Sequence, residues 1–131
     1  MIDPTIVTLA ALLRTATPVD IDLREMECLA HVVYAEARSE PLAAQVAVAS
    51  TVVNRGAPCD VTRRPRQFAS LARKPEGVAW TQAAEVAVLV ATGSVHRYNA
   101  THFHDTSVKP YWTRNMTFVG RSGRLLFWKG Y

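Results

Sequence analysis

The sequence lacks any apolar run that could span a lipid bilayer, which needs about 20 residues. Its longest candidate, residues 6–13, is interrupted by Thr8 and followed by Arg14. It also lacks the basic start of a secretory signal, because its first charge is Asp3 and Pro4 follows at once. We therefore expect neither membrane insertion nor a signal peptide.

Cysteine is scarce, and its spacing matches neither a zinc site nor a redox motif. Cys28 and Cys59 leave two possibilities open, a pair of buried thiols or one disulfide. A bridge would close a loop of about 30 residues and contribute about 3 kcal/mol to stability through chain entropy. It would form only in an oxidising compartment.

The size and composition fit one globular domain over residues 1–131, because 49% of the residues are apolar and one core can serve this length. Charge is uneven along it. Residues 1–40 carry seven acids and three arginines, whereas the rest carries twelve basic residues and four acids. Such a basic surface attracts nucleic acid, anionic lipid or the acidic bacterial envelope, and charge alone does not choose among them.

Helical periodicity runs through most of the chain before Gly93. Asp3 and Pro4 favour a helix start, and Thr81 and Gly93 are expected to cap and end the last helix. The predicted helices cover about residues 3–14, 23–38, 42–54 and 81–92.

Two other regions show a different pattern. Residues 56–79 contain three prolines and are predicted to form a loop, with a short helix around residues 67–72. After Gly93 the side chains alternate in type, which predicts a strand at 101–104 and a hairpin of 116–119 with 124–128. The expected fold is α+β, predominantly α, with a small antiparallel sheet toward the C-terminus.

Glu36 is the first candidate for chemistry, because it lies in the last turn of an otherwise apolar helix. Lost hydration and the negative end of the helix dipole both raise the pKa of such a carboxyl group. An acid that stays protonated near neutral pH can donate to a leaving glycosidic oxygen. On pattern alone, an exposed glutamate paired with Arg38 remains the alternative.

Glu40 is a second carboxylate four residues further on. It could act with Glu36 as base or nucleophile, or place negative charge at the start of the next helix; we favour this capping and structural role. Asn54 and Gln67 lie beside apolar neighbours and could hydrogen-bond a sugar amide or satisfy nearby backbone.

His102 and His104 would share one face of a strand, and a third ligand such as Asp105 or His96 could complete a zinc site. The chain contains no HExxH element, so we favour histidines that line a polar cleft. The aromatic residues around them, which suit sugar rings or belong in the core, are Tyr98, Phe103, Tyr111 and Trp112.

Four blocks of the sequence, in order, resemble the SleB-type cell-wall hydrolases. They are CLA at 28–30 with YAEARSEP at 34–41, QVAVASTVVNR at 45–55, QF at 67–68 and ATHFHDTSVKPYW at 100–112. The family's elements are similar: CLA with YxEARGEP, GQxAVAxVVxNR, QF and ATHFHxxxVxPxW. Ser39 stands where the family usually has glycine, and its closing IGxHxFY is only approximated by Val119-Gly120 and Phe127-Trp128.

The resemblance implies a lysozyme-like fold related to lytic transglycosylases, with residues 23–131 as the core and residues 1–22 as an added helix and connector. It implies a monomeric enzyme without cofactor or metal that cleaves the bond between N-acetylmuramic acid and N-acetylglucosamine in peptidoglycan. Glu36 would be its acid/base, and a Cys28–Cys59 bridge gains support. The substrate-binding residues expected from it are Tyr34, Asn54, Gln67, Phe68, Thr101, His102, Phe103, His104, Tyr111 and Trp112.

Two other functions stay open. One is a zinc amidase or peptidase that uses His102 and His104, and the other is a non-enzymatic basic module that binds wall polymer or nucleic acid. The resemblance favours the glycosidase, so we expect no nucleic-acid partner. A small, basic wall enzyme without a signal peptide resembles a phage endolysin, stored in the host cytoplasm and released through a holin for lysis.

Overall fold

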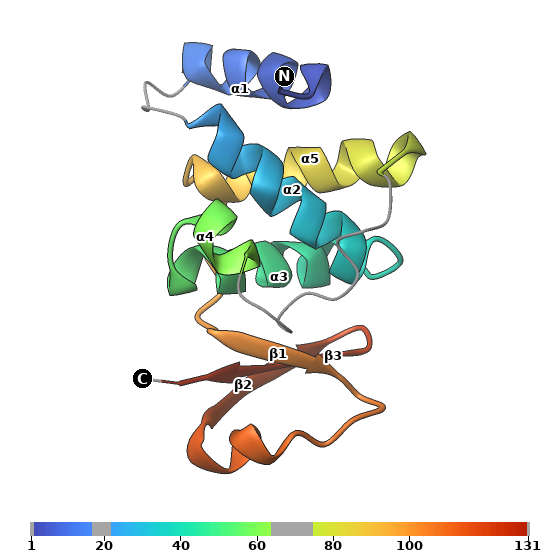
Figure 1. Cartoon of the computed structure of the whole chain (residues 1–131), viewed down its shortest axis with the longest axis vertical. Helices are drawn as coiled ribbons and strands as arrows, with labels where there is room; N and C mark the ends of the chain where they lie inside the picture. The colour runs from blue at the N-terminus through green and yellow to red at the C-terminus, as the bar shows by residue number, and fades with distance from the viewer. Residues whose placement is uncertain (1, 17–21, 64–74, 131) are drawn as a thin grey trace.

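A computed structural model describes residues 2–16, 22–63 and 75–130 of the chain. Its elements are α1 (Pro4–Ala16), α2 (Leu23–Ala37), α3 (Leu42–Arg55), α4 (Pro58–Thr62), α5 (Gly77–Ala91), β1 (His102–Asp105), the 3-10 helix η2 (Tyr111–Asn115), β2 (Thr117–Ser122) and β3 (Leu125–Lys129). Figure 1 shows the helices stacked above a small sheet that lies below α3. The predicted α+β class with dominant helices is confirmed.

The first two helices begin where the sequence supplies caps. The Asp3 carboxylate accepts hydrogen bonds from the backbone N–H of Thr5 at 2.8 Å and from the Trp80 indole at 3.1 Å, which anchors α1 to α5. The Asp22 side chain accepts from the backbone N–H groups of Arg24 and Glu25. Each carboxylate satisfies donors that a helix start leaves free.

Small and branched side chains make the helical core. The periodic positions predicted for α2 are buried: Met26, Leu29, Ala30, Val33, Tyr34 and Ala37. Val48 on α3 and Val88 on α5 are fully buried beside them, and each such side chain stabilises the fold by about 1.5–3 kcal/mol. Alanines at many facing positions let the helices approach closely.

Two predictions between residues 56 and 92 were wrong. Residues 58–62 form α4 rather than loop, because Pro58 occupies the first turn, where its missing N–H costs nothing. The last helix begins at Gly77, and Thr81 lies inside it with its hydroxyl donating to the Gly77 carbonyl at 3.4 Å instead of capping. The predicted helix at 67–72 lies outside the described residues.

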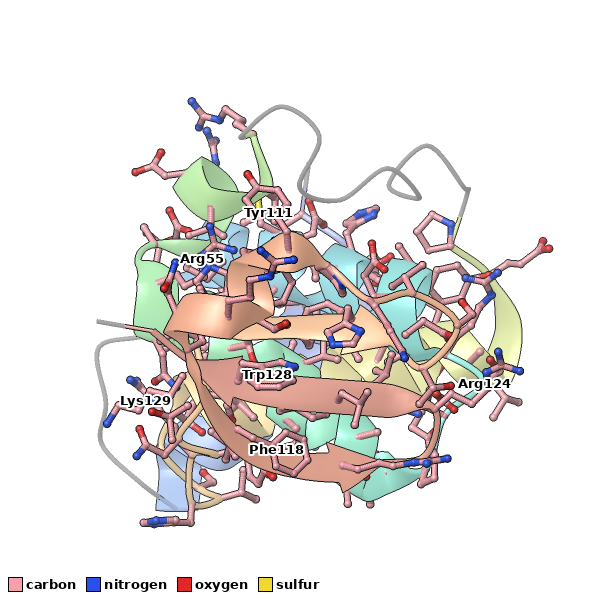
Figure 2. All side chains as sticks on the ribbon, turned by 90° about the horizontal axis from the view of Figure 1, so that it is seen from below. Arg55, Tyr111, Phe118, Arg124, Trp128 and Lys129 are labelled. Atoms are coloured by element: carbon pink, nitrogen blue, oxygen red, sulfur yellow. A yellow bond between two sulfur atoms is a disulfide. The ribbon has the colours of Figure 1, made fainter. Side chains whose placement is uncertain are left out.

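The sheet has the order β1-β3-β2 and is antiparallel throughout. The predicted hairpin is confirmed, and Gly123 turns it with φ +58°, a left-handed value that favours glycine. Phe127 and Leu125 of β3 are buried against the helical core. Trp128 follows Phe127 along the strand, so its side chain lies on the opposite face of the sheet, which Figure 2 shows from below. Its partner in β1 is His102.

A disulfide joins Cys28 on α2 to Cys59 on α4 with 5.2 Å between their Cα atoms, so the bridged alternative is confirmed. A second contact supports the same junction, because the backbone N–H of Cys59 donates to the Glu25 carboxylate at 2.7 Å. In the part of the chain that the structure describes, no helix is long and apolar enough to cross a membrane.

Candidate active site

Glu36 is the last residue but one of α2, and its side chain is half-buried. Burial raises the pKa of its carboxyl group, and the charge of Arg38 only partly opposes this. Arg38 instead turns back on its own helix, where it donates to the carbonyls of Tyr34 and Ala35 at 3.1 Å each. The structure therefore agrees with the raised pKa predicted from the sequence, and burial is its cause.

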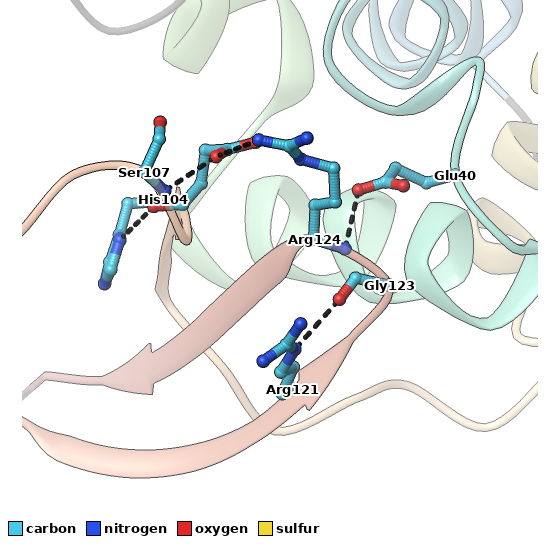
Figure 3. A network of polar contacts seen from close by, with 7 residues as sticks. Glu40, His104, Ser107, Arg121, Gly123 and Arg124 are labelled. Carbon is cyan, nitrogen blue, oxygen red and sulfur yellow. Dashed lines mark hydrogen bonds and ion pairs between the residues drawn. The ribbon is translucent and has the colours of Figure 1, made fainter.

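Glu40 does not cap α3, so the capping part of the role favoured for it was wrong, whereas a structural role agrees with its contacts. The N-cap of α3 is Pro41, without a capping bond from any side chain. The Glu40 carboxylate accepts a hydrogen bond from the backbone N–H of Arg124 in the hairpin turn at 2.9 Å. Figure 3 shows this contact, which brings the C-terminal end of α2 next to the sheet. In the folded chain, the donor to Glu40 is therefore the distant Arg124 N–H and not a backbone N–H at the start of α3.

Asn54 and Thr101 both hold the backbone that leads into β1. The Asn54 amide donates to the carbonyls of Tyr98 at 2.9 Å and Ala100 at 2.8 Å, which uses both of its hydrogens. The Thr101 hydroxyl accepts from the backbone N–H of Gly130 at 2.8 Å. For Asn54 the structure thus matches the alternative in which it satisfies nearby backbone.

The two strand histidines belong to an aromatic cluster on the outer face of the sheet. Trp112 of η2 lies 5.4 Å from His102 and 5.6 Å from His104 between ring centroids, and Trp128 stacks on His104 at 6.1 Å. The His104 Nδ1 bonds to the Asp105 carbonyl oxygen at 2.8 Å. Burial lowers the pKa of His102, and the charge of Arg55 lowers it further. This environment favours the neutral imidazole of His102.

The remaining predicted substrate residues are scattered. Tyr34 is only 5% exposed, with its ring edge against Trp80, so it belongs to the core. Phe103 packs on Phe127 at 5.9 Å beside that core. Tyr111 is 81% exposed and is free to meet a large ligand. Gln67 and Phe68 lie outside the described residues.

The sequence did not point to Gly123 and Arg124 as part of this region. Arg124 donates through its backbone to Glu40, and its guanidinium pairs with Asp105 at 3.2 Å. The backbone N–H of Ser107 and then Arg124 lower the pKa of Asp105 to about 2. The glycine at the hairpin turn was the one local signal for a special backbone, and it did not indicate that the turn contacts Glu40 after α2.

A zinc site finds no support in the geometry. Within residues 2–16, 22–63 and 75–130, no three His, Cys, Asp or Glu side chains gather in a way that could hold a metal ion. The His102 and His104 rings are instead engaged with Trp112 and neighbouring polar atoms.

Comparisons with known proteins place this geometry in a family. The model of the cell wall hydrolase family matches residues 39–128, a stretch that begins three residues after Glu36. No curated protein matches the chain.

Two solved structures are similar over nearly their whole length. The catalytic domain of the germination-specific lytic transglycosylase SleB from Bacillus anthracis has 25% sequence identity and a TM-score of 0.69, covering 86% of this chain and 100% of that one. The catalytic domain of the Bacillus cereus SleB protein has 26% identity and a TM-score of 0.66, covering 88% of this chain and 98% of that one. With the family model matching more than half of its residues, the chain belongs to the cell wall hydrolase family.

Proposed function

We propose that this enzyme cleaves the bond between N-acetylmuramic acid and N-acetylglucosamine in peptidoglycan as a lytic transglycosylase, with Glu36 as its general acid and base. The observation that carries the proposal is the place of Glu36, half-buried in the last turn of α2, where burial raises the pKa of its carboxyl group. The likeness to the SleB catalytic domains supports the same chemistry.

In the proposed reaction, protonated Glu36 donates its proton to the glycosidic oxygen as the bond to the muramic carbon breaks. The resulting carboxylate then takes the proton of the muramic 6-hydroxyl, whose oxygen closes an anhydro ring on that carbon. The proton returns to Glu36 and the atoms balance without water. One well-placed carboxyl group therefore suffices.

The two carboxylates beside the hairpin turn, Glu40 and Asp105, are both engaged in hydrogen bonds, which supports ring closure over attack by water. A hydrolase would use a second carboxylate, separated from the acid by a set distance, to activate water or act as nucleophile. Glu40 is bonded to the hairpin turn and Asp105 is bonded to Arg124 and Ser107. Residues 64–74, which carry Gln67 and Phe68, contain no Asp or Glu.

Digestion of purified sacculi followed by mass spectrometry tests the proposal. We expect fragments that end in anhydro-muramic acid. Reducing muramic ends would show a hydrolase, new free amino groups would show an amidase or peptidase, and an unchanged sacculus would show a binding module. Each of the last three results would contradict the proposed reaction.

The pH dependence follows from the acid form of Glu36. Because burial raises the pKa of this carboxyl group above 4.5, the active protonated form persists to higher pH than in a solvated glutamate. We expect kcat/KM to fall as the pH rises through this raised pKa. Rates on a soluble glycan fragment, measured across the pH range, check this; a profile that falls already near the ordinary value would contradict it.

A further inference from the structure

Two turns, one between helices and one in the sheet, meet beside the end of α2. One is the α2–α3 turn at Glu40 and Pro41, and the other is the hairpin turn at Gly123 and Arg124 (Figure 3). The Glu40 Oε1 accepts from the Arg124 backbone N–H at 2.9 Å. A Cβ atom at Gly123 would lie 2.8 Å from Pro41 Cδ and 3.0 Å from Glu40 Oε2. The close fit and the left-handed φ together require glycine at position 123.

The helical end of this contact is fixed by a buried amide. Gln45 of α3 is 1% exposed, and its Nε2 donates to the Glu40 carbonyl at 3.2 Å and to Gln82 Oε1 of α5 at 2.9 Å. The Glu40 backbone N–H also donates to the Ala37 carbonyl at 2.9 Å, at the last residue of α2. The backbone of Glu40 is therefore held against α2, α3 and α5 together.

The sheet end is fixed in a similar way. The Arg124 guanidinium donates to Asp105 Oδ1 at 3.2 Å, and the Arg124 carbonyl accepts from the Thr106 backbone N–H at 2.9 Å. Both contacts join the hairpin turn to the end of β1, the strand that carries His102 and His104. Moving the turn would therefore move the strand with it.

We propose that Glu40 is a positioning residue, which ties the hairpin turn to the end of α2 and so fixes the sheet relative to Glu36. This inference rests on the proposed function and assigns Glu40 no proton transfer. Glu36 lies four residues before Glu40, in the last turn of α2, so a shift of the hairpin relative to α2 also shifts β1 relative to the acid. Displacements of about 1 Å in substrate-positioning elements can lower rates by about 100-fold.

The contact with Arg124 requires an oxygen that accepts a hydrogen bond, but not a group that takes up a proton. This requirement distinguishes a positioning role of Glu40 from a role as a catalytic base. Glu40→Gln keeps an acceptor oxygen at the same position, so its kcat/KM is expected to stay within about threefold of the wild type. Glu40→Ala removes the acceptor and is expected to lower kcat/KM by about 10- to 100-fold, mainly through KM. Both variants should keep the wild-type pH profile, since Glu36 is unchanged.

Two further variants act as matched controls on the hairpin side. Arg124→Ala keeps the backbone N–H that Glu40 binds and also the backbone carbonyl that accepts from Thr106 and joins the turn to β1. It loses only the ion pair with Asp105, which is exposed and contributes little. It should resemble the wild type. Gly123→Ala forces a side chain against Pro41 and Glu40 at a left-handed φ, and should resemble Glu40→Ala.

An assay independent of catalysis completes the test. Amide hydrogen exchange at Arg124 should be protected in the wild type and Glu40→Gln but fast in Glu40→Ala, while amides of α2 stay protected in all three. A Glu40→Gln variant as inactive as Glu40→Ala, with an altered pH profile, would overturn the inference in favour of chemistry at Glu40. Unchanged kinetics or unchanged exchange in Glu40→Ala would also overturn it. Failure of the proposed function would appear differently, as wild-type digests without cleaved glycan.

Discussion

Replacement of Glu36 by glutamine is expected to lower cleavage of sacculi by about 10²- to 10⁴-fold, the usual contribution of general acid–base catalysis. Glutamine has nearly the same shape but cannot deliver a proton to the glycosidic oxygen or take one from the muramic hydroxyl. Because Glu36 lies half-buried at the end of α2, the exchange leaves the packing of that helix intact. Release of soluble muropeptides per unit time is the measurement.

The stability of this variant provides an internal check. Burial raises the pKa of Glu36, so the folded chain binds its proton more tightly than the unfolded chain does. That stabilising effect is complete below the ordinary pKa of 4.5 and is lost as pH rises through the raised value. At higher pH, Glu36→Gln should therefore melt no lower than the wild type.

A charge-matched variant separates catalysis from wall binding. Glu85→Gln removes one negative charge from an exposed position on α5 and should leave lysis near the wild-type rate. If Glu36→Gln also cleared sacculi at a near-wild-type rate, with its fold intact, Glu36 could not be the acid.

The helices could be predicted well wherever burial on one face leaves a periodic pattern. Val33 and Ala37 recur on the buried side of α2, and Asp22 caps its start. The first turn of α5 carries no such pattern, because Val78 is 86% exposed and Gly77 resembles a helix breaker. Its φ of +73° shows that this glycine instead supplies the backbone that leads into the helix.

In the candidate site, too, features set by the local sequence could be predicted, and features set by tertiary contacts could not. The raised pKa of Glu36 could be predicted because Glu36 lies in the last turn of a helix whose periodic apolar positions already indicated burial. The partner of Glu40 could not, because the Arg124 N–H is 84 residues away and reaches Glu40 only once the hairpin has docked. Alternation placed His102 and His104 on one face, but their packing on Trp112 depends on where η2 returns beside β1.

Loss of the Cys28–Cys59 disulfide is expected to destabilise the domain by about 3 kcal/mol, from the chain entropy of the unfolded state. The bridge links residues 31 positions apart, and it fastens the five-residue helix α4 to α2. For a domain of this size, that change lowers the melting temperature by roughly 10 °C. Thermal unfolding of a Cys28→Ser/Cys59→Ser double variant, followed by circular dichroism, measures it.

Reductant supplies the matched control for this variant. Wild-type protein with the bridge reduced should melt close to the double variant, whereas the double variant should be indifferent to reductant. Serine leaves the backbone N–H of Cys59 free to bind Glu25, so the remaining contact that holds α4 is preserved. An equal melting temperature for oxidised wild type and double variant would contradict the prediction, because it would mean that contacts such as those of Glu25 and the buried Val61 hold α4 and that the bridge adds nothing to stability.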